Sequence, residues 1–126
     1  SAFLERSVVT YANSAKIDCL QVSPDILEQH GAVSEDCAVA MARGVKTASR
    51  TDIGLAVTGI AGPDGGTEDK PVGTVFMAMT GPYGERVERL HFHGNREQVR
   101  MRTACTALDW LRRQALQQIS DVPQEN

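Results

Sequence analysis

A glycine-rich segment is the first feature of this sequence that could do chemistry. Four glycines occur in the nine residues 59–67 (GIAGPDGGT), directly after the apolar run 53–58. Glycine lets backbone N–H groups approach an anion that a side chain would block, and open α/β sheets bind ligands at the ends of interior strands. The segment is not a Walker loop, because Pro63 follows Gly62 where that motif needs Lys-Ser/Thr. A ligand-binding loop and a tight crossover are equally good interpretations.

Tyr11 and Lys16 form a second candidate. Lys16 lies five residues after Tyr11, just beyond the predicted strand 8–11, so both side chains could point into one cleft. A desolvated lysine can act as a general base, and a tyrosine hydroxyl can relay or stabilise a proton, so such a pair can activate a serine nucleophile. The spacing by itself favours two surface residues over a catalytic pair.

The last third of the chain carries further candidates. His91 and His93 share one face of a predicted strand, as two metal ligands would, but no third ligand has suitable spacing, so a half-exposed edge strand is the favoured interpretation. Arg96 falls in the first turn of a predicted helix, where free N–H groups and the helix dipole favour an anion and a guanidinium can bind phosphate.

Charge is also unevenly distributed along the chain. Residues 85–113 hold seven arginines and four acidic residues, whereas the chain as a whole has a net charge of -3. A solvated helix face is the simpler explanation of this local excess, and a bound small anion is the alternative.

Strands and helices must position these candidate residues. Four short runs rich in apolar and β-branched residues predict strands at 8–11, 53–58, 72–80 and 85–92. The two middle runs are continuously apolar, as expected for strands in the interior of a sheet. The last two strands are joined by a four-residue turn, which requires them to be antiparallel.

Capping residues predict three helices. Ser23 and Gly31 bound the first, Ser34 opens a second that ends near Arg50, and Asn95 with Gln98 resembles a capping box that opens the third. We expect the second helix to present one face made of Cys37, Met41, Val45 and Ala48, and the third to bury Met101, Ala104, Leu108, Leu111 and Ala115. Residues 119–126 are expected to form a frayed tail.

The composition bounds the class of protein. The 126 residues are 41% hydrophobic and 23% charged, which is typical of one globular domain, and no run approaches the 18 apolar residues of a membrane helix. A pI near 5.5 and six aromatic residues argue against nucleic-acid binding. Three widely spaced cysteines indicate neither a disulfide framework nor a zinc site, and favour a reducing cytoplasm. The order of elements predicts a three-layer α/β/α sandwich with a mixed β-sheet.

Five stretches together resemble the CinA C-terminal domain family, the nicotinamide mononucleotide deamidases. They are residues 9–16 (VTYANSAK), 31–34 (GAVS), 58–67 (TGIAGPDGGT), 70–75 (KPVGTV) and 94–96 (GNR). The resemblance covers nearly all of residues 1–118. It implies an amidohydrolase that converts nicotinamide mononucleotide to nicotinic acid mononucleotide and ammonia in bacterial pyridine-nucleotide recycling. It also implies a Ser/Lys/Tyr site that needs no metal or cofactor.

The family's site residues carry over only in part. By resemblance, Tyr11 and Lys16 match the catalytic tyrosine and lysine, and four residues match substrate contacts: Ser1, Thr58, Gly59 and Arg96. The family's nucleophilic serine lies in a Glu-Ser-Cys-Thr-Gly-Gly stretch without a counterpart here, so we expect it upstream of residue 1, together with the first strand and helix of the family fold. We also expect a homo-oligomer that binds neither nucleic acid nor membrane. The alternative is a noncatalytic nucleotide-binding or competence-associated interaction module.

Overall fold

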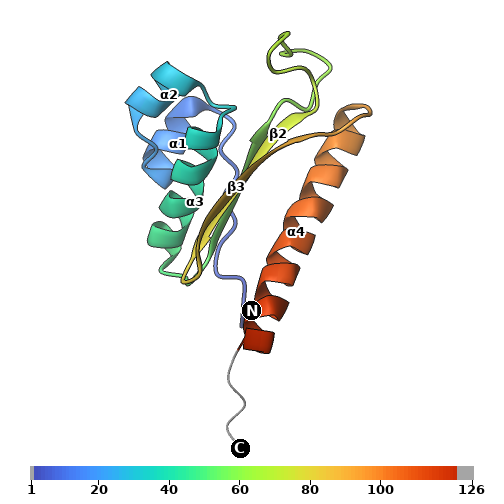
Figure 1. Cartoon of the computed structure of the whole chain (residues 1–126). Helices are drawn as coiled ribbons and strands as arrows, with labels where there is room; N and C mark the ends of the chain where they lie inside the picture. The colour runs from blue at the N-terminus through green and yellow to red at the C-terminus, as the bar shows by residue number, and fades with distance from the viewer. Residues whose placement is uncertain (1, 122–126) are drawn as a thin grey trace, which may run out of the picture.

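The protein is an α/β fold with helices on both faces of one sheet (Figure 1). The computed structural model describes residues 2–121. Helices α1 to α3 cover one face of the sheet and α4 covers the other, so the predicted three-layer arrangement is confirmed. The elements are α1 (Asn13–Leu20), α2 (Pro24–His30), α3 (Glu35–Ser49), β1 (Gly54–Gly59), β2 (Thr74–Gly81), β3 (Gly84–His91) and α4 (Arg96–Asp121).

The central strand β2 divides the core into two halves. Because side chains alternate along a strand, Phe76 and Ala78 pack towards α3, whereas Val75, Met77 and Met79 pack towards α4. Seven of the eight β2 residues are buried. The register places Thr58 of β1 opposite Phe76 of β2, at the end of the sheet where β1 ends and β2 begins.

The sheet differs from the prediction in two respects. It is antiparallel throughout its three described strands, in the order β1-β2-β3, so the expected mixed sheet is not found in residues 2–121. β1 also lies at an edge, although its apolar run was expected in the interior. The run is apolar because helices cover both faces of β1. A continuous apolar pattern indicates that both faces of a strand are covered, but it does not indicate whether another strand pairs with its edge.

The segment 8–11 is extended but is not a strand of this sheet. Val9 is 72% exposed and Tyr11 is 77% exposed, whereas Thr10 is buried. The β-branched residues favour the extended backbone that was expected. The carbonyl of Thr10, however, accepts a hydrogen bond from a lysine side chain rather than from a neighbouring strand.

The helix starts follow the predicted caps. Ser23 Oγ accepts a hydrogen bond from the Asp25 amide at 3.3 Å, and Ser34 Oγ accepts one from the Cys37 amide at 3.2 Å. Asn95 and Gln98 form a reciprocal pair, in which each side-chain oxygen accepts from the other's backbone N–H at 2.9 Å. These bonds satisfy amides that have no partner inside a helix, and each N-cap contributes about 1 kcal/mol.

The buried face of α4 is not the predicted one. Its buried residues are Val99, Thr103, Ala107 and Trp110, which recur every three or four positions. Met101 and Leu108 of the expected face are each 63% exposed, Ala104 and Ala115 are exposed, and Leu111 is partly buried. The helical period was therefore right and its phase wrong, because α4 carries two apolar faces and periodicity does not say which one meets the sheet.

Two smaller expectations have mixed outcomes. In α3, Cys37 and Met41 are buried, Val45 is half-buried and Ala48 is exposed near the helix end. Of the expected tail, 119–121 belong to α4, and 122–126 lie outside the described residues.

Within the described part of the chain, no helix is long and apolar enough to cross a membrane.

Candidate functional site

The glycine-rich segment forms a loop between β1 and β2 at one end of the sheet (Figure 1). The Ile60 amide bonds to the Thr74 carbonyl at 2.9 Å, and the Gly73 amide bonds to the Ile60 carbonyl at 2.7 Å, so the base of the loop is closed. Three glycines of this loop have positive φ values, and Gly65 is one of them, with a φ of 94°. Gly62 and Gly73 have φ values of 87° and 97°, and a Cβ on Gly73 would lie 2.1 Å from the Phe92 carbonyl oxygen.

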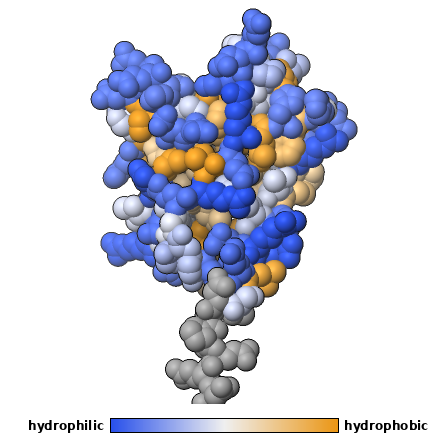
Figure 2. Space-filling model, in the orientation of Figure 1, coloured by the Kyte–Doolittle hydropathy of each residue, from blue (hydrophilic) through white to orange (hydrophobic). Residues whose placement is uncertain are grey.

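Three elements meet at this end of the sheet. Thr58 Oγ1, at the end of β1, donates to the Ala32 carbonyl between α2 and α3 at 2.7 Å. Arg96 Nη1, in the first turn of α4, donates to the Gly62 carbonyl of the loop at 3.0 Å. In the space-filling view, the surface is hollowed between the lobe of α1 and α2 and the lobe of the glycine loop (Figure 2). The predicted residues Thr58 and Gly59 therefore lie where β1 enters the glycine loop, and Arg96 contacts the loop.

Arg96 retains the capacity to bind an anion. Its side chain is exposed, and the Gly62 carbonyl takes one of the five N–H donors of the guanidinium. Since α4 begins at Arg96, the unpaired amides and positive dipole end of the helix lie at the same place. This combination is suited to a phosphate or carboxylate group.

Lys16 is a buried side chain of α1. It is 6% exposed, and its Nζ donates to the Thr10 carbonyl at 2.6 Å. Its charge acts on Cys37 in the first turn of α3: burial raises the pKa of the Cys37 thiol, and nearby Lys16 lowers it by less. Within residues 2–121, Lys16 has no carboxylate partner, which is unusual for a buried lysine.

The other sequence-predicted residues are placed differently. Tyr11 precedes α1 and is exposed, and no hydrogen bond joins its hydroxyl to Lys16 in the part of the chain described. Ser1 lies outside the described residues. His91 Nε2 lies 3.0 Å from the Val72 carbonyl oxygen, and its ring meets that of His93 edge to face, with centroids 4.7 Å apart. No group of three or more potential metal ligands occurs within residues 2–121.

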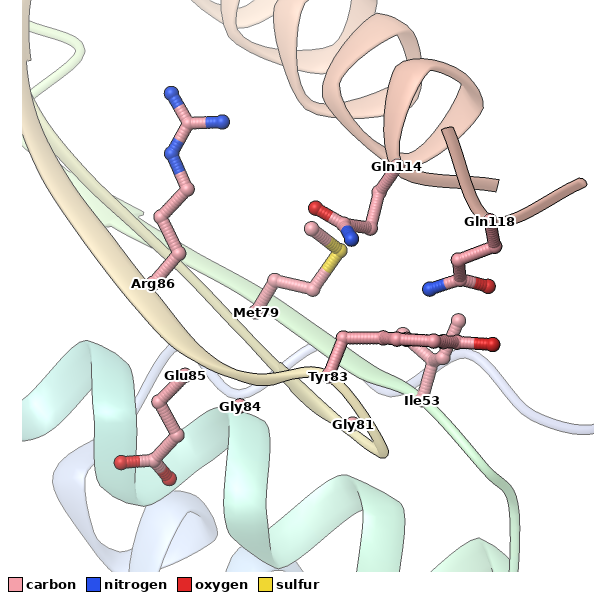
Figure 3. A pocket seen from close by; sticks show the side chains of 9 residues that line it. All are labelled: Ile53, Met79, Gly81, Tyr83, Gly84, Glu85, Arg86, Gln114 and Gln118. Atoms are coloured by element: carbon pink, nitrogen blue, oxygen red, sulfur yellow. The ribbon is translucent and has the colours of Figure 1, made fainter. Parts of the chain in front are cut away.

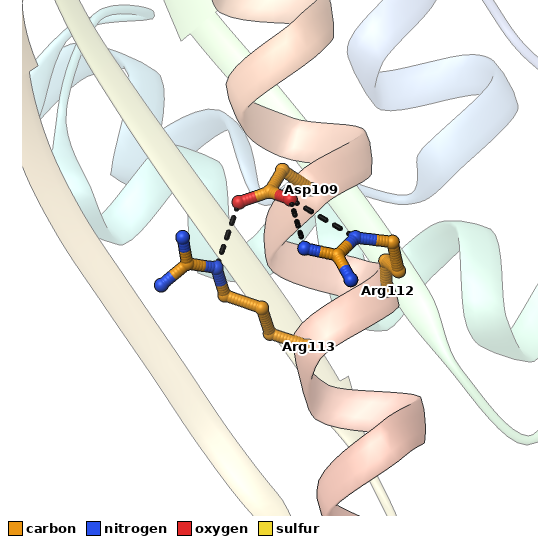
Figure 4. Close-up of polar contacts among 3 residues, drawn as sticks. All are labelled: Asp109, Arg112 and Arg113. Atoms are coloured by element: carbon orange, nitrogen blue, oxygen red, sulfur yellow. Dashed lines mark hydrogen bonds and ion pairs between the residues drawn. The ribbon is translucent and has the colours of Figure 1, made fainter.

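Most arginines of residues 85–113 bind other surface groups of the protein. Arg112 and Arg113 both bind Asp109 at 2.8 Å (Figure 4), and these hydrogen bonds, chiefly that from Arg112, hold the pKa of Asp109 below its ordinary value. Arg86 pairs with Glu88 and stacks over Trp110, 4.4 Å from the ring centroid. The solvated face therefore explains these arginines, whereas Arg96 is directed to the glycine loop.

A cavity of about 260 Å³ lies at the opposite end of the sheet, between the β2–β3 hairpin and the C-terminal turns of α4 (Figure 3). Met79, Tyr83, Gln114 and Gln118 are among its lining residues. None of the sequence-predicted site residues borders it.

The residue that sequence reasoning missed is Lys70, whose Nζ donates to the Val33 carbonyl at 2.6 Å. A Lys-Pro pair after a loop usually indicates only an exposed turn, so the signal was weak.

The fold is an α/β domain in which a candidate site lies around a glycine loop at one end of the sheet. The chain belongs to the CinA C-terminal domain family, whose model matches residues 1–115. It is 64% identical over 113 residues to a CinA-like protein of Syntrophotalea carbinolica, covering 90% of this chain and 27% of that protein. It is 50% identical to a putative competence-damage inducible protein of Acetivibrio thermocellus, with the same coverage.

Solved structures agree with this assignment. The chain superposes on the competence/damage inducible protein CihA of Agrobacterium tumefaciens with a TM-score of 0.78 and 41% identity, covering 81% of this chain and 63% of that one. The competence damage-inducible protein A of Klebsiella pneumoniae gives a TM-score of 0.77 and 37% identity, with the same coverage. The chain spans about a quarter of the length of the curated relatives it matches.

Proposed function

We propose that this chain is the substrate-binding part of an amidohydrolase that converts nicotinamide mononucleotide to nicotinic acid mononucleotide and ammonia. The observation that carries the proposal is the position of Lys16, a buried lysine without a carboxylate partner in residues 2–121, beside the first turn of α3. The residues just before that turn are bonded to Thr58 at the end of β1. A candidate base and a candidate anion site thus face the same end of the sheet.

The proposed substrate lies across this end. Its phosphate binds Arg96 and the start of α4, and its nicotinamide ring is directed to the corner formed by Thr58 and Gly59. Thr58 Oγ1 donates its proton to the Ala32 carbonyl, so the oxygen can still accept a hydrogen bond from the carboxamide N–H. Backbone N–H groups of the glycine loop are the available donors for an oxyanion.

The proposed chemistry needs a serine that is not assigned among these 126 residues. In the proposed reaction Lys16 acts as a neutral amine, which takes the serine proton as the serine oxygen attacks the carboxamide carbon. The C–N bond then breaks, and the nitrogen leaves as ammonia with the proton from Lys16. Water hydrolyses the resulting ester to nicotinic acid mononucleotide and frees the serine. Tyr11 stabilises the proton during transfer in this proposal, which requires its exposed side chain to turn towards Lys16.

The decisive experiment compares ammonia release from nicotinamide mononucleotide by the 126-residue chain and by a longer form that carries the upstream strand and helix of the family. We expect binding without turnover for the chain and turnover for the longer form. Deamidation by the chain alone, freed of any longer contaminant, would show that one of its own serines is the nucleophile.

A noncatalytic nucleotide-binding module is the second candidate. It is favoured by one observation: within residues 2–121, Lys16 bonds a backbone carbonyl and no serine hydroxyl. Under this hypothesis the longer form binds the mononucleotide as tightly as the chain and releases no ammonia. The same assay therefore separates the two functions.

A further inference from the structure

Three consecutive carbonyls between α2 and α3 are each bound by a side chain from a different element. Ser34 Oγ, the N-cap of α3, donates to the Gly31 carbonyl at 2.8 Å. Thr58 Oγ1 of β1 donates to the Ala32 carbonyl at 2.7 Å. Lys70 Nζ of the glycine loop donates to the Val33 carbonyl at 2.6 Å. This short connection therefore joins the end of β1, the glycine loop and the start of α3.

Lys70 itself is held firmly on the loop side. Its amide donates to Thr67 Oγ1 at 3.0 Å, and its carbonyl accepts from the Thr67 amide at 2.9 Å. Its ammonium lies 5.8 Å from the centroid of the buried Phe76 ring. Arg89 lies 5.7 Å from the same ring and donates to the Asp69 carbonyl, so the turn before Lys70 is fixed to β3 as well.

The contact at the Val33 carbonyl bears on helix α3, because the next residue along the chain is Ser34. Ser34 caps α3, and Cys37 in the first turn of that helix is fully buried in the electrostatic field of Lys16. Ser34 and Cys37 thus connect Val33 to the first turn of α3, and α3 packs against α1, the helix that carries Lys16. The connection runs through two hydrogen bonds and one packed helical turn.

We propose that Lys70 is a positioning residue that holds the glycine loop in register with the start of α3 and thereby with Lys16. This inference rests on the proposed function for its effect on the substrate. The contact to Val33 and its effect on the loop are properties of the chain itself. Lys70 forms no ion pair within residues 2–121, and its ammonium binds a backbone carbonyl and lies over an aromatic ring.

The test uses the 126-residue chain with Lys70→Met, Lys70→Arg and the control Lys46→Met, which removes a lysine from the last turn of α3. Amide hydrogen exchange reports the loop, and calorimetry with nicotinamide mononucleotide reports the site. We expect Lys70→Met to speed exchange at Thr67 and Gly73 about tenfold and to weaken binding about tenfold, because a charge-assisted hydrogen bond is lost. Lys70→Arg, which keeps a charged donor, should restore both, and Lys46→Met should change neither.

Two results would overturn the proposal: unchanged exchange in Lys70→Met, or faster exchange with unaltered binding. If the wild-type chain does not bind the mononucleotide, the proposed function fails, and the exchange rates alone decide the role of Lys70. If Lys70→Met does not fold, the wild-type ammonium protons provide the measurement. Those of Lys70 should be visible in proton–nitrogen spectra because hydrogen bonding slows their exchange with water, and their absence would contradict the contact.

Discussion

Arg96 of α4 donates a hydrogen bond to the carbonyl of Gly62, 34 residues earlier in the chain. This bond places a guanidinium at the rim of the glycine loop and attaches the loop to the start of the helix. The two features that sequence reasoning had identified separately, a helix start suited to an anion and a glycine loop, therefore lie side by side.

Replacing Arg96 by alanine should weaken binding of nicotinamide mononucleotide by about one to two orders of magnitude, since a hydrogen bond to a charged group contributes roughly 1.5–3 kcal/mol. Titration calorimetry measures the change. Arg100→Ala, one turn further along the same exposed helix, is the matched control and should have little effect. Nicotinamide riboside lacks the phosphate, so wild-type affinity equal for the riboside and the mononucleotide would contradict the assignment.

Lys16→Ala in the longer, turnover-competent form should lower kcat by at least about 10²-fold, as expected for loss of a general base, with little change in substrate affinity. Tyr11→Phe should be less harmful, because the tyrosine only assists the proton transfer. Turnover should persist in the presence of chelators. A loss of binding equal to the loss of turnover in Lys16→Ala would assign the lysine to substrate binding instead.

The sequence alone predicted the helix caps and the glycine loop better than it predicted the packing around them. The helix caps and the glycine loop depend on neighbouring residues, so local patterns were sufficient for them. The outward position of Met101 depends on which face of α4 meets the sheet, and the edge position of β1 depends on pairing partners distant in sequence. The contact of Lys70 was missed for the same reason, because its partner, the Val33 carbonyl, is 37 residues away in the chain.

Glu85 should contribute to stability in a pH-dependent way. The hydrogen bond from Arg43 is the main cause that holds the pKa of Glu85 below its ordinary value of 4.5, with help from Thr80. A carboxylate with a lowered pKa stabilises the fold above the unfolded-state pKa, and this contribution is lost as the pH falls through the folded-state pKa.

Urea unfolding of Glu85→Gln should therefore show a shallower loss of stability below about pH 4.5 than the wild type does. The effect should be small, because the ion pair is at the surface and screened by salt. Glu28→Gln on α2 is the control and should follow the wild-type curve. Parallel curves for Glu85→Gln and the wild type would indicate that the pair with Arg43 does not form in solution.

Strand β1, an edge strand of the sheet formed within residues 2–121, should associate with a second copy of the chain. Gly54–Gly59 carries no charge and no proline, the usual features that keep an edge strand from pairing with another. Val57 on this strand is 38% exposed, and Met101 and Leu108 of α4 are exposed as well. We therefore expect light scattering to show a dimer or larger species at high concentration. Val57→Lys places a charge on the edge and should shift the chain towards monomer, whereas Tyr83→Lys, at the exposed β2–β3 turn, should not. A monodisperse wild-type monomer at high concentration would rule out this association.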